Sequence, residues 1–205
     1  MRCSVGLLAL AFLLAPSAIA TTYLVRPDGT GDFPTIQAAV DGSVAGDVIE
    51  LANGTFTGPG NRDVEYGGKA VTIRSQSGDP EACVIDCEGS PTEPHQALHI
   101  IASDTWLALE GVTITGGCHE WGGGVTCDGH APTIRGCRFI NNQSPGSEGG
   151  GLYCRADEPQ IEDCWFSENS AFHGGGASSC WMHATFTRCT FVNNTAAEEG
   201  GGMRY

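Results

Sequence analysis

The sequence has little positive charge. Ten lysines and arginines stand against 24 aspartates and glutamates in 205 residues, the formal net charge is −14, and Lys69 is the only lysine. Such a surface repels phosphate backbones and anionic membranes. We therefore expect no nucleic acid among the partners of this protein.

The sequence also lacks a second long hydrophobic run after its N-terminus. The first run, residues 5–15, follows Arg2 and precedes the small residues Ala18 and Ala20. This order is typical of a secretory signal peptide, and the run is too short to span a bilayer stably. We expect residues 1–20 to be removed after Ala20, leaving a secreted or cell-surface chain, residues 21–205, without a transmembrane segment.

Glycine, in contrast, is abundant, and triple glycines recur at a regular spacing. The chain has 30 glycines, about twice the usual share. The triplets 122–124, 149–151, 174–176 and 200–202 begin 27, 25 and 26 residues apart. A period in the twenties is typical of a solenoid of small repeated units.

Other residues keep step with the glycines. Each unit repeats two cysteines, a phenylalanine and, three residues later, an asparagine: Cys127, Cys154 and Cys180; Cys137, Cys164 and Cys189; Phe139, Phe166 and Phe191; Asn142, Asn169 and Asn194. Apolar residues alternate locally, as strands with one buried face require, and the repeated part has no ten-residue stretch of helical periodicity.

These patterns predict an all-β fold, a right-handed parallel β-helix, with irregular first coils at 21–108 and regular repeats of about 26 residues at 109–205. Equivalent residues should stack on successive coils about 4.8 Å apart, with phenylalanines inside and asparagines at a bend. The last coil begins at Gly200 and is not capped. We expect the natural protein to continue beyond it; the alternative is a partner docked on the open end.

Charged residues also fall on equivalent positions of consecutive coils. Glu110, Arg135 and Glu162 alternate in sign, and Asp163 and Arg188 form a similar pair. Opposite charges on adjacent strands stabilise a sheet by about 0.2–1 kcal/mol each. This pattern gives the arginines a structural role and makes them poor candidates for catalysis.

Two segments resemble known β-helix proteins. Residues 25–40, with Gly46 to Ile49 after them, resemble the opening of pectin-lyase-like proteins, pectin methylesterases included. The F-x-x-N motif, present at Phe139, Phe166 and Phe191, resembles the repeats of chlamydial-type polymorphic outer membrane proteins. The resemblance implies the same fold for nearly the whole mature chain, with a short N-terminal helix covering the end of the stack. It leaves function open, because this fold serves lyases, esterases, hydrolases and adhesins.

The sequence does not carry the motifs that a β-helix enzyme would need. It has no Gln-Asp-Thr run, and no group of three carboxylates recurs on equivalent coils. His130 and His183 fall two coils apart, about 9.6 Å, which is too far for one zinc ion. We therefore predict no catalytic residue, metal or cofactor, although an enzyme remains an alternative.

The repeated cysteines leave three alternatives open. Cysteines stacked on neighbouring coils can form disulfides, since one coil spacing matches the Cα separation of such a bond. Pairing within a coil, such as Cys127 with Cys137, fits the spacing equally well. Buried thiols that serve as small apolar residues are the third alternative. Nine cysteines follow the predicted signal peptide, so at least one of them stays free or pairs with another chain.

Aromatic residues outside the core positions are the candidate binding residues. Tyr153 and Trp165 should point outward from strands, and Trp121 and Trp181 should lie at corners of the coil. Flat rings on such a surface stack on sugar faces, or they pack on neighbouring side chains. The sequence thus favours a rod for adhesion, glycan contact or structural support without catalysis. The alternative is a lyase or esterase acting on an acidic polysaccharide.

Overall fold

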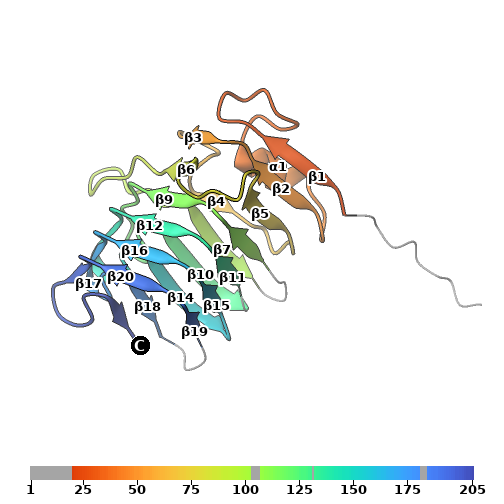
Figure 1. Cartoon of the computed structure of the whole chain (residues 1–205). Helices are drawn as coiled ribbons and strands as arrows, with labels where there is room; N and C mark the ends of the chain where they lie inside the picture. Colours follow the sequence, from red (N-terminus) through yellow and green to blue (C-terminus); the bar gives the residue numbers. More distant parts are fainter. Residues whose placement is uncertain (1–19, 103–106, 131, 181–183) are drawn as a thin grey trace, which may run out of the picture.

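The protein is a parallel β-helix. The computed structural model describes residues 20–102, 107–130, 132–180 and 184–205, so the predicted signal peptide lies outside the described part except for its last residue, Ala20. Each coil after the first contributes one strand to each of three long sheets, which form the walls of the solenoid (Figure 1). This architecture confirms the fold class that the repeats predict.

The strands pair in parallel with the same order in every sheet. Sheet 1 contains β1 (Thr22–Val25), β2 (Val48–Leu51), β5 (Thr72–Ser75), β8 (Ala108–Glu110), β11 (Thr133–Arg135), β15 (Gln160–Glu162) and β19 (Thr185–Thr187). Sheet 2 contains β3 (Gly54–Phe56), β6 (Cys83–Asp86), β9 (Thr113–Thr115), β12 (Arg138–Ile140), β16 (Trp165–Ser167) and β20 (Thr190–Val192). Sheet 3 contains β4 (Val64–Glu65), β7 (Leu98–Ala102), β10 (Val125–His130), β14 (Leu152–Asp157), β18 (Ala177–Ser179) and β22 (Met203–Arg204).

A fourth, shorter sheet fills the corner between sheets 2 and 3. It contains β13 (Gln143–Glu148), β17 (Ser170–His173) and β21 (Thr195–Ala196). The triple glycines follow this sheet. Gly149 has φ +70°, and a Cβ on Gly150 would lie 2.2 Å from the carbonyl oxygen of Gly175. Stacked backbones meet at this corner too closely for a side chain, which explains why glycine returns in every coil.

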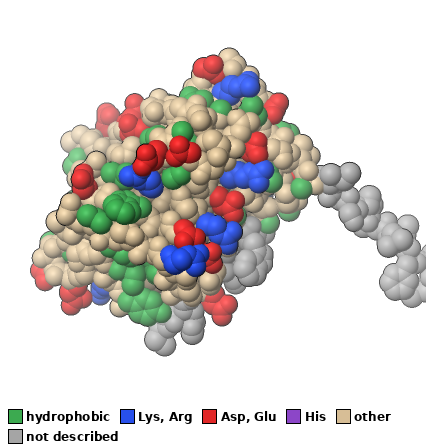
Figure 2. All heavy atoms as spheres, in the orientation of Figure 1, with side chains coloured by type: hydrophobic (Ala, Val, Ile, Leu, Met, Phe, Trp, Pro, Cys, Tyr) green, Lys and Arg blue, Asp and Glu red, His purple; other side chains and the backbone are tan. Residues whose placement is uncertain are grey.

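The core consists of columns of identical or similar side chains. The rings of Phe139 and Phe166 stack with centroids 4.7 Å apart and planes 4° apart, and Phe166 and Phe191 stack at 4.8 Å and 6°. Register explains this column, because Phe139 pairs with Phe166 and Phe166 with Phe191. Charged side chains lie on the outer face (Figure 2). Alternation along each short strand therefore separates core from surface.

The asparagines form a hydrogen-bonded ladder beside this column. The Asn142 side-chain amide donates to Asn169 Oδ1 at 3.1 Å, and that of Asn169 donates to Asn194 Oδ1 at 2.9 Å. Each amide also donates to a backbone carbonyl, as Asn169 does to Phe139 at 2.8 Å. The ladder satisfies buried backbone groups at a bend that strands leave unpaired.

A short helix, α1 (Ile36–Gly42), lies against β1, β2 and β4. Thr35 caps its first turn, with its hydroxyl accepting from the Ala38 amide at 3.2 Å. Ile36, Ala39 and Val40 are buried, as their spacing on one helix face predicts. The Lys69 ammonium donates to the Val40 carbonyl at 2.8 Å and so satisfies the C-terminal end.

The cysteines of the described residues are free thiols. Their thiols donate to backbone carbonyls of the preceding coil, as Cys137 does to Leu109 at 3.5 Å and Cys189 to Ile161 at 3.4 Å. Cys164 also donates to the Ile134 carbonyl at 3.6 Å. Neither disulfide pattern is present among the described residues. Four of the six repeated cysteines are buried thiols, the third alternative, whereas Cys189 is half-buried and Cys180 is exposed.

Candidate functional site

The four predicted aromatic residues do not form one surface. Trp165, 39% exposed, lies on β16 in sheet 2, whereas Trp121, 41% exposed, lies beside sheet 3. Tyr153 faces away from the coil interior but is only 5% exposed, because the Trp121 ring covers it at a centroid distance of 5.1 Å. The Tyr153 ring thus packs on a neighbouring side chain, which is the second of the two alternatives for these aromatic residues. Trp181 and His183 lie outside the described residues.

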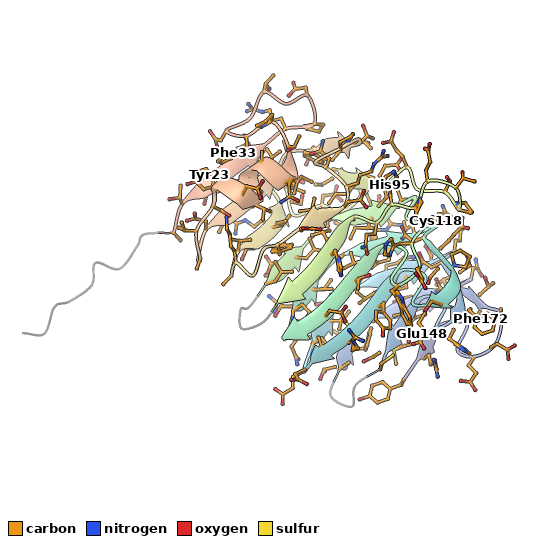
Figure 3. The ribbon with its side chains drawn as sticks, turned by 180° about the vertical axis from the view of Figure 1, so that it is seen from behind. Tyr23, Phe33, His95, Cys118, Glu148 and Phe172 are labelled. Atoms are coloured by element: carbon orange, nitrogen blue, oxygen red, sulfur yellow. The ribbon has the colours of Figure 1, made fainter. Side chains whose placement is uncertain are left out.

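Polar groups surround Tyr153 on the outer face of sheet 3. The Glu148 carboxylate, labelled in Figure 3, accepts from the Ser178 hydroxyl at 2.7 Å, from the Cys180 thiol at 3.0 Å and from Arg204. Burial opposes ionisation of Glu148, but these three donors outweigh it and lower its pKa. Partial burial and the Glu148 carboxylate raise the pKa of the Cys180 thiol. Cys180 is thus a protonated thiol near neutral pH, which makes it a poor nucleophile.

An acid–base pair lies at the N-terminal edge of sheet 3. Nδ1 of His95 is 2.6 Å from Oδ2 of Asp63, and the other carboxylate oxygen of Asp63 accepts from the Gln96 amide at 3.0 Å. Such a carboxylate orients an imidazole for proton transfer. No sequence pattern indicated this pair, because its members are separated by 32 positions in the irregular first coils.

A row of alternating charges runs along the outer face of sheet 1. Strands β2, β5, β8, β11 and β15 each contribute one residue, in the order Glu50, Arg74, Glu110, Arg135 and Glu162. The preceding residue on each strand is a buried isoleucine or leucine, so alternation turns every charged side chain outward. Neighbouring residues of the row have opposite signs, which extends the predicted Glu110–Arg135–Glu162 ladder by two coils.

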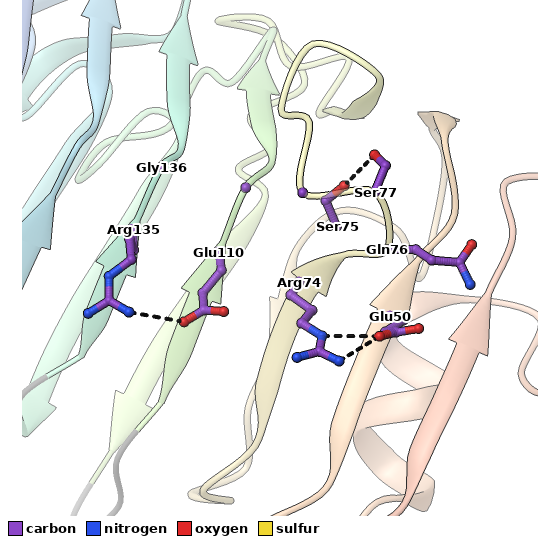
Figure 4. A pocket seen from close by; sticks show the side chains of 10 residues that line it. Glu50, Arg74, Ser75, Gln76, Ser77, Glu110, Arg135 and Gly136 are labelled. Carbon is purple, nitrogen blue, oxygen red and sulfur yellow. Dashed lines mark hydrogen bonds and ion pairs between the residues drawn. The ribbon is translucent and has the colours of Figure 1, made fainter.

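The ion pairs within this row leave one break. Nη2 of Arg74 lies 2.6 Å from Oε1 of Glu50, and Arg135 lies 3.8 Å from Glu110 and 3.1 Å from Glu162. Arg74 and Glu110 are neighbours in the register, yet the described residues show no ion pair between them. Instead, Arg74 pairs with Glu50 and Glu110 pairs with Arg135, as Figure 4 shows.

A hollow of about 460 Å³ opens over this break. Its charged and polar lining consists of Glu50, Arg74, Ser75, Gln76, Ser77, Glu110 and Arg135, and its glycines are Gly78, Gly111 and Gly136. The volume lies in the range of small-molecule sites in proteins. Guanidinium, carboxylate, amide and hydroxyl groups together offer both donors and acceptors, which suits a ligand rich in hydroxyl groups.

One turn position decides where the hollow is open. Gly111 and Gly136 follow the charged row with φ of +62° and +60°, and a Cβ on Gly136 would meet no atom within 4 Å. In the next two coils Asp163 and Arg188 occupy the same position with φ +54° and are joined by an ion pair of 2.6 Å. Side chains therefore cover this turn in the two later coils, whereas Gly111 and Gly136 leave it open in the coils that form the hollow.

The described residues contain no cluster of three or more histidine, cysteine, aspartate or glutamate residues placed to hold a metal ion. In the same part of the chain, no helix combines the length and hydropathy that crossing a bilayer requires.

The comparisons with known proteins identify the fold. A family model described as right handed beta helix region matches residues 53–203, which is most of the chain. No curated protein and no solved structure matches. The match begins at the turn before β3 and ends in β22, so it includes nine of the ten residues that line the hollow of sheet 1; Glu50 on β2 precedes it. The chain belongs to the right-handed β-helix family.

Proposed function

We propose that this chain is a secreted or cell-surface scaffold that contacts glycans without catalysis. The observation that carries the proposal is the hollow on sheet 1, which is open, polar and bounded by side chains from four successive strands. Secretion is supported by the N-terminal residues 1–20, which have the order of a signal peptide.

Rigidity supports the proposal. The groups that line the hollow stand on strands whose inner faces pack in the core, and Ile73 and Leu109 beneath Arg74 and Glu110 are fully buried. Preorganised groups lose little conformational entropy when a ligand binds. The long stacked sheets therefore hold the groups that line the hollow in fixed positions, which favours binding of a sugar whose individual contacts are weak.

A glycan-degrading enzyme is the second candidate, favoured by the Asp63–His95 pair. An oriented imidazole is a general base for proton abstraction from a sugar or from water. Substitution of His95 by alanine separates the two functions, because it should abolish turnover by an enzyme and leave glycan binding at sheet 1 unchanged.

The test is binding of the purified protein to a glycan array, with product analysis of each bound glycan. Gly136→Asn should weaken binding at least about tenfold, because the new side chain fills the hollow. Asparagine tolerates the left-handed φ of +60°, so the cost in stability should stay below about 1 kcal/mol.

A matched control is Gly67→Asn. Gly67 has φ +56°, a Cβ there would also meet no atom within 4 Å, and it does not line the hollow. Equal binding by wild type, Gly136→Asn and Gly67→Asn would exclude the hollow as the contact site. Released sugars or unsaturated ends that disappear in His95→Ala would establish the enzyme instead.

A further inference from the structure

We propose that the hollow of sheet 1 selects neutral, hydroxyl-rich glycans and discriminates against acidic ones. This inference rests on the proposed function and adds the class of ligand. It follows from how the charges of the hollow are already paired.

Both guanidinium groups of the hollow are engaged with carboxylates. Arg74 directs Nε and Nη2 to the same oxygen of Glu50, at 3.1 Å and 2.6 Å. Arg135 lies between two carboxylates, 3.8 Å from Glu110 and 3.1 Å from Glu162. A ligand carboxylate must displace one of these partners to reach a guanidinium, and the displaced glutamate then lies close to the ligand as a like charge.

The net charge acts in the same direction. The row from Glu50 to Glu162 contains three carboxylates and two guanidiniums. The whole chain carries −14. An anionic polymer is therefore repelled both at long range and in the hollow, most strongly at low ionic strength.

A sugar hydroxyl, in contrast to a carboxylate, can bind in the hollow without displacing an ion pair. The 3.8 Å between Arg135 and Glu110 exceeds a hydrogen bond, so a hydroxyl placed beside both can accept from the guanidinium and donate to the carboxylate. The break between Arg74 and Glu110 offers the same combination of one donor and one acceptor. Vicinal hydroxyls of a neutral glycan satisfy both without displacing an ion pair.

The carboxylates also make hydroxyl donors a requirement. Glu110 has 34% of its side chain exposed at the break, and a bound ligand covers it. A covered carboxylate that receives no donor loses its hydration without compensation. A ligand that carries carboxylates in place of hydroxyls both fails to donate and adds repulsion.

The experiment measures the affinities of length-matched oligosaccharides by titration calorimetry at low salt. Neutral oligomers of glucose, xylose and mannose are compared with oligogalacturonate. We expect the tightest neutral oligomer to bind at least about tenfold more tightly than oligogalacturonate. Raising the salt concentration should narrow the difference by screening the repulsion.

Glu110→Gln tests the role of the carboxylate. It preserves shape but removes the charge, so neutral binding should weaken, oligogalacturonate binding should strengthen, and their ratio should fall about tenfold. The control is Asp128→Asn, which removes a carboxylate paired with Arg155 at 2.9 Å on sheet 3 and should leave the ratio unchanged.

The outcomes separate the inference from the proposed function. Binding of oligogalacturonate in preference to every neutral oligomer would overturn the inference and leave a glycan scaffold in place. A ratio that Glu110→Gln leaves unchanged would also overturn it. Failure of the wild type to bind any glycan, on this panel or on the array, would overturn the proposed function itself.

Discussion

Replacing Asn169 by alanine should destabilise the solenoid strongly, although the change removes only a few atoms. Asn169 is fully buried in the middle of the asparagine ladder. Its amide donates to the Phe139 carbonyl at 2.8 Å and to Asn194, and its oxygen accepts from the Asn142 backbone amide at 3.0 Å and from the Asn142 side chain. One side chain therefore makes four hydrogen bonds.

The free energy of unfolding lost in Asn169→Ala can be worked out in two ways, and the results agree. Four hydrogen bonds at a net contribution of about 0.5–1.5 kcal/mol each amount to about 2–6 kcal/mol. Alternatively, the variant leaves two buried backbone groups without this partner, the Phe139 carbonyl and the Asn142 amide, at about 1–3 kcal/mol each. Either figure is a large part of the about 5–15 kcal/mol that stabilises a typical domain.

The assay is urea unfolding combined with amide hydrogen exchange. With a slope of about 2–3 kcal/mol per molar urea, the midpoint should fall by about 0.7–3 M. Solenoid coils contact mainly their neighbours, so protection should fall first at the Asn142 amide while β1 and β2 keep theirs.

The control is Asn193→Gly. Asn193 is exposed with φ +53°, a conformation that glycine adopts freely, so this variant should be as stable as the wild type within about 1 kcal/mol. If Asn169→Ala costs no more than Asn193→Gly, or if protection at Asn142 is unchanged, the ladder does not hold the coils together and the reasoning is refuted.

Two further predictions concern the outer face of sheet 3. Because its hydrogen-bond donors lower the Glu148 pKa, Glu148 stabilises the fold above the ordinary glutamate pKa, about 4.3, and this contribution is lost as the pH falls through the lowered value. The stability advantage of wild type over Glu148→Gln, from urea midpoints, should therefore be full at pH 7 and shrink as the pH falls below the ordinary glutamate pKa; a constant difference would contradict the pairing. Cys180, the exposed thiol of the described residues, should react first with an aromatic disulfide reagent, slowly at pH 7 because its pKa is raised, and faster in Glu148→Gln, which lacks the nearby charge. Cys180→Ser should remove this first reaction, and an unchanged rate in that variant would assign it to another thiol.

The sequence was sufficient to predict the columns, because a solenoid places equivalent repeat positions directly above one another. Phe139, Phe166 and Phe191 could be aligned by counting, and the structure stacks them at the spacing of neighbouring strands. The same counting predicted the ladder of Glu110, Arg135 and Glu162. Such contacts depend on register alone, and the repeat fixes the register.

Contacts that depend on how a corner folds back over a sheet could not be predicted in this way. Trp121 covers Tyr153 because the segment before the triple glycine returns over sheet 3, and no periodicity encodes that approach. The sequence did not predict the hollow, for a related reason. The hollow depends on which of two neighbouring carboxylates each arginine pairs with, and Arg74 pairs with Glu50 and not with Glu110. The one sequence signal for the hollow is the change from Gly111 and Gly136 to Asp163 at the same turn position of successive coils.

That turn has a consequence for how the family can vary. Its backbone keeps nearly the same left-handed conformation whether glycine, aspartate or arginine occupies it, from φ +62° at Gly111 to +54° at Arg188. A point mutation at this turn changes the shape of the outer surface and leaves the path of the backbone unchanged. The length of the hollow is thus a trait that evolution can change one coil at a time, separately from the stability of the solenoid.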